Sequence, residues 1–408
     1  MRALQFGQSL VYSGGVDGAR ALLGSIAGSI ISVAALASSI AITALALASG
    51  QFGSRLLRNF MDDRGFQIAL GTFNGTFLFC LVILRSTRSV DEGGGGVPQF
   101  SVTMALVLAV VCVFLLIYFL HHMARAIQAP YVIADAAKDL NEEIERLYGK
   151  SVEKKAAAAP DRIREIEEEG LPDWEEGFDI EADAGGYIKA VNYDLLLKVA
   201  IEHDRTFKLA FRAGNWVGIG DALVTVWPPL SPVAYEDKVR HCFIMGRDRS
   251  AVQDPEYGIN QLVEVAARAL SPGINDPFTA MTCLDYLGAA LNHVLRCDIP
   301  APYLLDDDRQ LRVVVNNVTF PGLCDSAFNM IRQYGADSPA VMIRMLETLA
   351  KIGAKCHNST QSEAIAGHAR LARDEALKET SIDRDVTDIE NRYARVLRSI
   401  ADHKEHLQ

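Results

Sequence analysis

The sequence predicts an integral membrane protein with an α-helical transmembrane part followed by an α+β soluble domain. Hydrophobic residues make up 50% of the 408 residues, and the mean hydropathy is +0.12, which is unusually high for a soluble protein. No lysine precedes Lys138, and almost all of the long uncharged runs lie before it. This uneven composition separates an apolar first third from a charged remainder.

Three uncharged runs predict three membrane helices, near residues 21–50, 66–84 and 102–120, in a transmembrane domain at 21–128 after a short N-terminal segment at 1–20. As a helix the first run is about 45 Å long, more than the roughly 30 Å of a bilayer core. It is too long, and has too little flanking positive charge, for a cleaved signal peptide. None of the runs contains Asp, Glu, Lys, Arg or His, which counts against a proton relay or an ion-coupled carrier.

Small residues recur at GxxxG spacing in the first two runs. Gly24 and Gly28 lie in the first run, and Gly71 and Gly75 flank Asn74 in the second. Such residues let helix backbones approach closely, and an amide in a span favours an interhelical hydrogen bond. We expect these two helices to be packed and the bulky third to face lipid. Two alternatives stay open: tight packing within one subunit, or a self-association face.

The flanking arginines and the cysteines favour a cytosolic C-terminal domain. Five basic residues flank the spans on one side and four on the other; the first set is Arg55, Arg58, Arg64, Arg125 and Lys138, and the second is Arg2, Arg20, Arg85 and Arg88. The cysteines are scattered without a CxxC pair, as in a reducing compartment.

Residues 129–185 are predicted to leave the membrane as a helix, near 135–147, and to continue as a solvated acidic connector. A small β module is expected at 186–230, because alternating apolar residues are separated by glycine turns. Its pattern resembles half of a barrel-sandwich (biotinyl- or lipoyl-like) module. It lacks a lysine at the tip, so a carrier role is not expected.

The remainder, 231–408, is predicted to be α-rich, with one hairpin across residues 303–315. Asp254-Pro255 and Asp276-Pro277 each place an acidic N-cap before a proline at the first helical position. Further helices are expected at 256–270, 278–295, 322–334, 339–355, 362–378 and 383–401.

One polar group in this region is a candidate ligand-binding or gating site. Helix N-termini offer free N–H groups and positive potential, so arginines near two helix starts are compatible with an anion pocket. The alternative is that the arginines only pair with the capping acids and with helix ends. The group consists of Arg247, Arg249, Gln253, Asp254, Gln261, Asn275, Asp276, Thr279 and Arg332.

Motifs of enzymes and nucleic-acid-binding proteins are absent from the sequence. There is no GxxxxGK[ST], HExxH, GxSxG or Rossmann glycine pattern, so no catalytic residue, cofactor or metal ligand is assigned and no enzyme activity is expected. The net charge of −11 argues against nucleic acid as a partner.

Four strings carry a resemblance to a known family: Ala19-Arg-Ala-Leu-Leu-Gly24, Ser49-Gly-Gln-Phe-Gly-Ser-Arg-Leu-Leu-Arg-Asn-Phe60, Gln253-Asp-Pro-Glu-Tyr-Gly-Ile-Asn-Gln-Leu262 and Arg268-Ala-Leu-Ser-Pro-Gly-Ile-Asn-Asp-Pro-Phe-Thr-Ala280. They resemble the bacterial predicted-membrane-protein family called domain-of-unknown-function family 2254, over nearly the whole chain. The resemblance implies a multi-pass protein of the bacterial inner membrane and brings no activity. Family members typically have one more membrane helix upstream, which implies that the N-terminus and the large domain are both cytosolic.

Two functions are compatible with these observations. The first is a channel-like or transport-like homo-oligomer gated by its cytosolic domain, suggested by the charge-free helices and their small-residue faces. The alternative is a membrane-anchored ligand sensor or scaffold with an anion or small-ligand pocket in the soluble domain.

Overall fold

The computed structural model describes residues 12–53, 63–87, 97–149, 166, 170–229, 235–297 and 299–407. The chain divides into two compact units, Met1–Val132 and Ile133–Gln408. Several residues used in the predictions lie outside the described ranges: Arg2, Arg55, Arg58, Arg88 and the connector residues 150–165 and 167–169.

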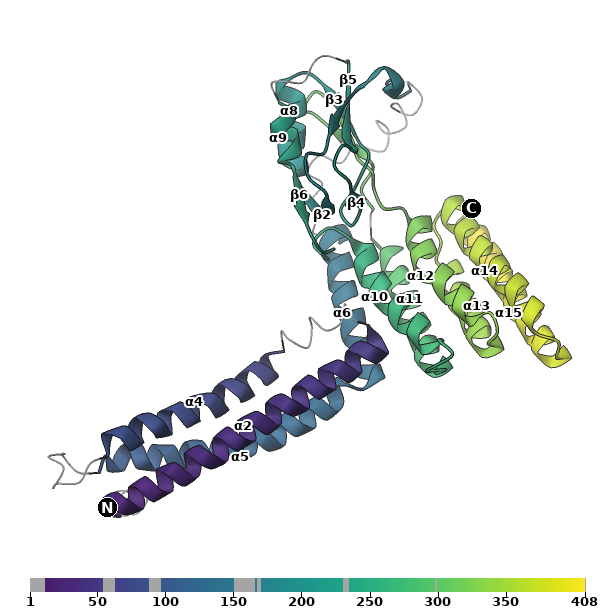
Figure 1. Ribbon diagram of the computed structural model, residues 1–408. Coiled ribbons are helices and arrows are strands. Elements are labelled where there is room, and N and C mark those ends of the chain that lie inside the picture. The colour runs from purple at the N-terminus through teal and green to yellow at the C-terminus, as the bar shows by residue number, and fades with distance from the viewer. Residues whose placement is uncertain are drawn as a thin grey trace. The chain divides into compact units, whose positions relative to one another are not determined.

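The first unit holds three long helices, α2 (Val16–Phe52), α4 (Arg64–Ser86) and α5 (Gln99–Ala126) (Figure 1). All three are long and apolar enough to cross a membrane, as the uncharged runs predicted. Asp63 caps α4 by accepting a hydrogen bond from the amide of Phe66 at 2.8 Å.

An alanine stripe on α2 forms the centre of this unit. Ala34, Ala37, Ala41, Ala44 and Ala48 are buried at alternating spacings of three and four residues, which places them on one face of the helix. This helix contacts both α4 and α5, and the small side chains allow the close approach.

The predicted glycine positions lie away from this packing. Gly24, Gly28, Gly71 and Gly75 are exposed, and a Cβ added at any of them would meet nothing within 4 Å. Asn74 is also exposed, and its Nδ2 donates to the carbonyl of Leu70 on the same helix at 2.9 Å. Of the two alternatives from the sequence, close packing of these glycines within one subunit is therefore not seen among the described helices, which pack through the alanine stripe instead.

The second unit contains two small sheets. One has the strand order β1-β5-β3-β8-β7 and the other β4-β2-β6. Neighbours are antiparallel except for β3 and β8, which pair in parallel. The strands are β1 (Phe178–Glu181), β2 (Gly186–Val191), β3 (Thr206–Leu209), β4 (Trp216–Val217), β5 (Ala222–Trp227), β6 (Phe243–Gly246), β7 (Tyr303–Leu305) and β8 (Leu311–Val314).

Some strands of these sheets lie outside the β module that was expected at 186–230. Strand β1 lies in the stretch expected to be a solvated connector, yet it pairs with β5 and its Ile180 is fully buried. From the expected α-rich region, β6 pairs with β2 and β8 pairs with β3. The result is an α+β region with two sheets, and the barrel-sandwich detail is not confirmed.

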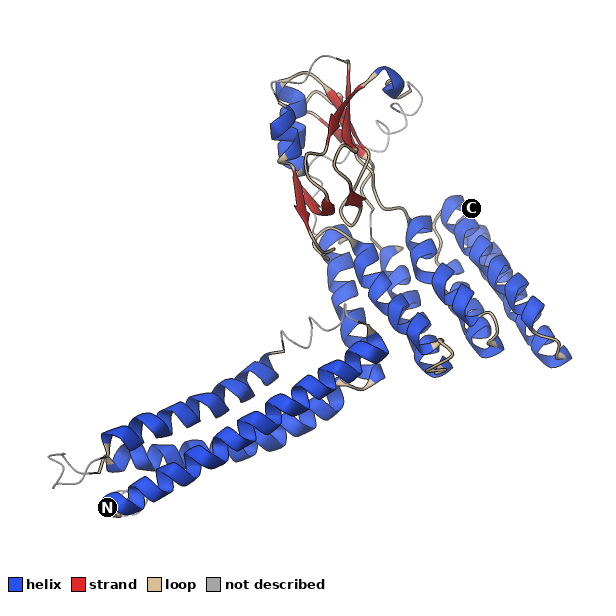
Figure 2. Cartoon of the chain, viewed as in Figure 1, coloured by secondary structure: helices blue, strands red, loops and turns tan. Residues whose placement is uncertain are grey.

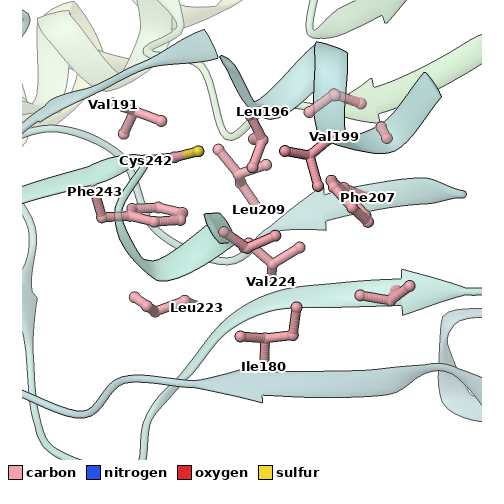
Figure 3. Packing of buried hydrophobic residues seen from close by; sticks show 14 of the residues in the cluster. Ile180, Val191, Leu196, Val199, Phe207, Leu209, Leu223, Val224, Cys242 and Phe243 are labelled. Atoms are coloured by element: carbon pink, nitrogen blue, oxygen red, sulfur yellow. The ribbon is translucent and has the colours of Figure 1, made fainter. Parts of the chain in front are cut away.

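The apolar core of this region lies between the strands and helices α8 (Tyr193–Glu202) and α9 (Glu236–Arg240). Figure 3 shows Leu196 and Val199 of α8 facing Phe207, Leu209 and neighbouring strand residues. Asn192 starts α8 by accepting a hydrogen bond from the amide of Leu195 at 3.0 Å.

Three helical hairpins follow and stack in two layers (Figure 2). Helices α10, α12 and α14 contact one another in sequence, as do α11, α13 and α15, which is the arrangement of a short α-solenoid. Their bounds are α10 (Pro255–Ala269), α11 (Pro277–Val294), α12 (Phe320–Gly335), α13 (Pro339–Gly353), α14 (Ser359–Glu379) and α15 (Asp383–Leu407). The six helices predicted after residue 255 are confirmed.

Helix α6 (Ala129–Tyr148) packs against the start of this array. A Cβ added to Gly258 of α10 would lie 3.2 Å from the Cβ of Leu140 on α6, so the two helices approach closely. Arg146 of α6 also donates to the carbonyl of Ala251 at 2.8 Å. These contacts hold the part of α6 that belongs to the second unit, from Ile133 onward, against the array.

Candidate functional site

A cleft of about 1320 Å³ opens in the second unit. It is lined by the C-terminal end of α6, the C-terminal end of α11, the segments on either side of the β7–β8 hairpin, and the first turns of α12 and α14. The lining residues are Glu145, Gly149, His293, Val294, Leu295, Arg296, Cys297, Ile299, Pro300, Pro302, Val315, Asn316, Asn317, Val318, Thr319, Phe320, Pro321, His357, Asn358, Thr360 and Gln361.

Two helices begin at this cleft, each with a polar cap. Thr319 precedes α12 and its Oγ1 accepts from the amide of Gly322 at 3.2 Å. Asn358 precedes α14 and its Oδ1 accepts from the amide of Gln361 at 2.9 Å. Helix N-termini carry partial positive charge from the peptide dipoles, so both termini raise the potential in the cleft.

Asparagines hold the walls near α12. The Nδ2 of Asn316 donates to the carbonyl of Ala210 at 2.8 Å, and the Nδ2 of Asn317 donates to the carbonyl of Pro300 at 2.8 Å. Both residues lie just after β8, beyond Val315. The hairpin is therefore tied by side chains to β3 on one side and to the preceding loop on the other.

Basic side chains outnumber acidic ones among the described lining residues. Arg296, His293 and His357 are the basic residues, and Glu145 is the acidic one. His357 is held in place because its Nε2 lies 2.9 Å from the carbonyl oxygen of Leu295 and donates to it. The lining therefore combines two helix N-termini and one guanidinium with the C-terminal ends of α6 and α11, which carry partial negative charge.

His293 links α11 to α6 at the edge of the cleft. Its Nδ1 lies 3.1 Å from Oδ1 of Asn141, and its Nε2 lies 3.0 Å from Oε2 of Glu145. Ligand atoms of Glu145, His293 and Cys297 all lie within 4.8 Å of one another. Because Asn141 and Glu145 are four residues apart on α6, both face the same side of that helix.

The group of polar residues predicted from the sequence is not gathered at this cleft. Near the start of α10, Asp254 accepts from Nε and NH2 of Arg249 at 2.9 and 2.7 Å. Gln253 pairs through its side-chain amide with the backbone of Val191. Arg247 is exposed, and Gln261 is buried within α10.

The other members of that group lie elsewhere. Asp276 accepts from the amide of Thr279 at 3.2 Å and from its hydroxyl at 2.6 Å, which confirms the predicted N-cap of α11. Asn275 is exposed and has φ of 49°. Arg332 is buried on α12 and pairs with Glu375 of α14. Because α10 and α11 form an antiparallel hairpin, their starts are separated by about 22 Å of helix.

Asp254 is the N-cap residue of α10 and Pro255 takes the first helical position, as predicted, but the expected capping role of the Asp254 side chain is not seen. No side-chain cap hydrogen bond is made at the start of α10, because the carboxylate turns to Arg249 instead. The carboxylate is fully buried, and its Oδ1 has no hydrogen-bond partner among the described residues. Gly214 has φ of +90°, and a Cβ there would overlap the Asp254 carboxylate, so the backbone lies directly against the acid.

A second buried acid, Glu143 of α6, lies close to this ion pair. Only 5% of Glu143 is exposed. Burial, followed by the charge of Asp254, raises the pKa of Glu143 to about 8. Burial also raises the pKa of Asp254, although Arg249 opposes the rise.

The comparisons with known proteins identify the family. The model of the DUF2254 family, described as a predicted membrane protein, matches residues 2–351. The chain belongs to this family. It is also similar to uncharacterized protein Mb1321c of Mycobacterium bovis and to uncharacterized protein Rv1290c of Mycobacterium tuberculosis, each 27% identical over 382 residues, covering 92% of this chain and 71% of the relative. No solved structure gives a significant match.

The family match covers most of the cleft but not all of it. The segments contributed by α6, α11 and α12 lie within the matched residues, whereas His357, Asn358 and the start of α14 lie beyond residue 351. The one sequence signal for this site was the spacing of His293 and Cys297, four residues apart. Glu145 lies 148 residues before His293, so no local pattern could connect them.

Proposed function

We propose that the protein is a membrane-anchored sensor that binds a small anionic molecule in the cleft of its second unit. The observation that carries the proposal is the cleft itself, which is lined by two helix N-termini, the guanidinium of Arg296 and the imidazole N–H groups of His293 and His357. Phosphate and carboxylate groups are the usual ligands of such surroundings. The proposal assigns binding and no catalysis.

Chain continuity supplies the connection to the membrane. Helix α6 lines the cleft with Glu145, and it follows the third candidate span, α5, after only Ile127 and Gln128. A ligand that favours one position of α6 therefore acts on a helix joined almost directly to a membrane span.

We place the second unit in the cytosol of a bacterial cell, with the spans in the inner membrane. The seven cysteines are all free thiols, as is usual in a reducing compartment. A cytosolic sensor domain would meet phosphorylated and carboxylate metabolites at high concentration.

Anion titration of the full chain in lipid nanodiscs tests the proposal. Inorganic phosphate and succinate serve as separate probes, with binding followed by calorimetry and by the unfolding midpoint. We expect at least one probe to bind and to raise the midpoint, and the Arg296→Gln variant to bind it about tenfold more weakly, as for the loss of a charged hydrogen bond.

Arg370→Gln is the matched control, because Arg370 is exposed on α14 outside the lining. Binding of neither probe would contradict the proposal. So would binding that is equally strong in the Arg296→Gln variant.

A second candidate function, a channel-like homo-oligomer, is favoured by one observation in the first unit. Gly24, Gly28, Gly71 and Gly75 open outward from the described helices, together with Asn74. Such a face is suited to close contact with another membrane helix, and in a homo-oligomer the partner is a second copy.

Light scattering of the detergent-purified chain, corrected for bound detergent, tests this second candidate. We expect a mass of several copies, and a shift toward monomer in Gly75→Leu, which adds bulk in open space and so spares the single-chain fold. Val110→Leu is the control, because Val110 is an exposed residue of α5. A monomeric wild-type protein would exclude the oligomeric pore.

A further inference from the structure

We propose that Glu145, His293 and Cys297 bind a transition-metal ion, with Zn²⁺ the best match to the donor set. The site lies at the edge of the cleft and goes beyond the proposed function, because a metal can bind there whether or not an anion does. It joins the C-terminal end of α6 to the C-terminal end of α11.

The three ligand atoms are already grouped. They lie within 4.8 Å of one another, and Nε2 of His293 is 3.0 Å from Oε2 of Glu145. Two ligands on a tetrahedral zinc ion, at bond lengths near 2.0–2.2 Å, are about 3.4 Å apart. The Glu145–His293 pair must open by a few tenths of an ångström, and a pair at the 4.8 Å limit must close by about 1 Å. The Glu145 side chain, which is 58% exposed, has room to move.

The tautomer of His293 presents a lone pair to the site. Asn141 donates through Nδ2 to the carbonyl of Ala137 at 2.8 Å, so its Oδ1 is the atom that faces His293. Nδ1 of His293 must therefore carry the proton that Asn141 accepts. In the neutral ring Nε2 then has a lone pair directed at a carboxylate oxygen, and this arrangement needs a cation between the two atoms.

A proton can supply that cation, and it joins two of the three groups, His293 and Glu145. A metal ion uses all three groups, and the Asn141–His293 hydrogen bond matches the outer contact that orients metal-binding histidines. The thiolate, imidazole and carboxylate together select zinc over calcium or magnesium, which prefer oxygen ligands. One thiolate and one carboxylate also balance the charge of a divalent ion.

Three protein ligands leave one position of a tetrahedral ion open. The three residues all line the cleft, so a water molecule or an anionic ligand could take that position. The metal would also link α6 to α11, and we expect it to stabilise the second unit.

Metal titration of the chelator-treated full chain in nanodiscs tests the proposal. Zn²⁺ stoichiometry is measured by mass spectrometry after dialysis, and Co²⁺ is used as the spectroscopic probe because a thiolate–cobalt bond gives a charge-transfer absorption band. We expect one equivalent of metal per chain and this band. Cys297→Ser should lose the band, and His293→Gln and Glu145→Gln should bind metal at least tenfold more weakly.

Two further variants separate metal binding from folding. Asn141→Ala should weaken binding about 10- to 100-fold although Asn141 is not a ligand. Glu142→Gln, an exposed position on the same helix, should leave binding unchanged. Circular dichroism checks that each variant is folded.

The proposal is overturned if folded wild-type protein binds no Co²⁺ with a thiolate band. It is equally overturned if Cys297→Ser keeps that band, since another cysteine would then be the ligand.

Discussion

Glu143 and Asp254 are acids that the fold buries within one cluster of charges. Asp254 has Arg249 as a direct partner, whereas Oε1 of Glu143 lies 3.9 Å from Arg146. Removing Arg249 would leave an uncompensated buried charge. Glu143 has no such direct partner among the described residues, so burial penalises its charged form and raises its pKa far above the ordinary range.

This raised pKa predicts a pH-dependent stability. The pKa of Glu143 is about 8 in the folded chain against a reference of 4.5, so the folded state binds the proton more tightly. Its contribution to the free energy of unfolding is fully present below about pH 4.5 and is lost as the pH rises through about 8. Glu143→Gln keeps a neutral side chain, so its stability relative to wild type should rise by roughly 2 to 4 kcal/mol between pH 5 and pH 9.

Unfolding midpoints measured across this pH range check the prediction. Glu142→Gln, on the same helix but exposed, should show no such trend. A Glu143→Gln profile parallel to that of the wild type would show that Glu143 is ionised in the folded protein.

Helices and caps were predictable from local sequence, and strand pairing was not. Apolar periodicity and N-caps such as Asp276 act within a few residues, and the six helices after residue 255 lie where these patterns placed them. The pairing of β3 with β8 joins Phe207 to Val313, which no local pattern specifies. Asp254 shows the limit of cap rules, because a nearby arginine competed for its carboxylate.

Local sequence patterns also could not predict the residues that line the cleft. His293, on the last turn of α11, and Cys297, just after that helix, are close in sequence, but Glu145 and the start of α14 are brought to the cleft by the packing of the helices. The predicted polar group was assembled from residues near helix starts, and the antiparallel arrangement of α10 and α11 separates those starts.

Two glycines in the helical array predict opposite effects of adding a methyl group. A Cβ at Gly288 of α11 would lie 2.4 Å from Cγ2 of Thr348 on α13, whereas a Cβ at Gly367 of α14 would meet nothing within 4 Å. Gly288→Ala should therefore destabilise the protein by about 1 to 3 kcal/mol through overpacking. Gly367→Ala should stabilise it by up to about 1 kcal/mol through helix propensity.

Thermal unfolding of the two variants beside wild type checks this pair. Equal effects of the two substitutions would show that α11 and α13 do not pack as closely as described.

At the scale of the whole molecule, three candidate membrane spans are joined to a soluble unit with two sheets and a short helical array. Among the described segments, the cleft is the place in the second unit where helix N-termini, basic side chains and the C-terminal end of α6 come together. Because α6 follows α5 after two residues, the cleft and the third candidate span share one continuous stretch of chain. The proposed sensor function needs such a shared element.

Hydrogen–deuterium exchange of the full chain in nanodiscs, with and without saturating inorganic phosphate or succinate, tests this account most directly. We predict slower exchange in peptides covering residues 293–297, 316–321 and 357–361, together with a change in α6. An anion that binds while slowing exchange only elsewhere, or one that protects the cleft and leaves α6 unchanged, would contradict the account.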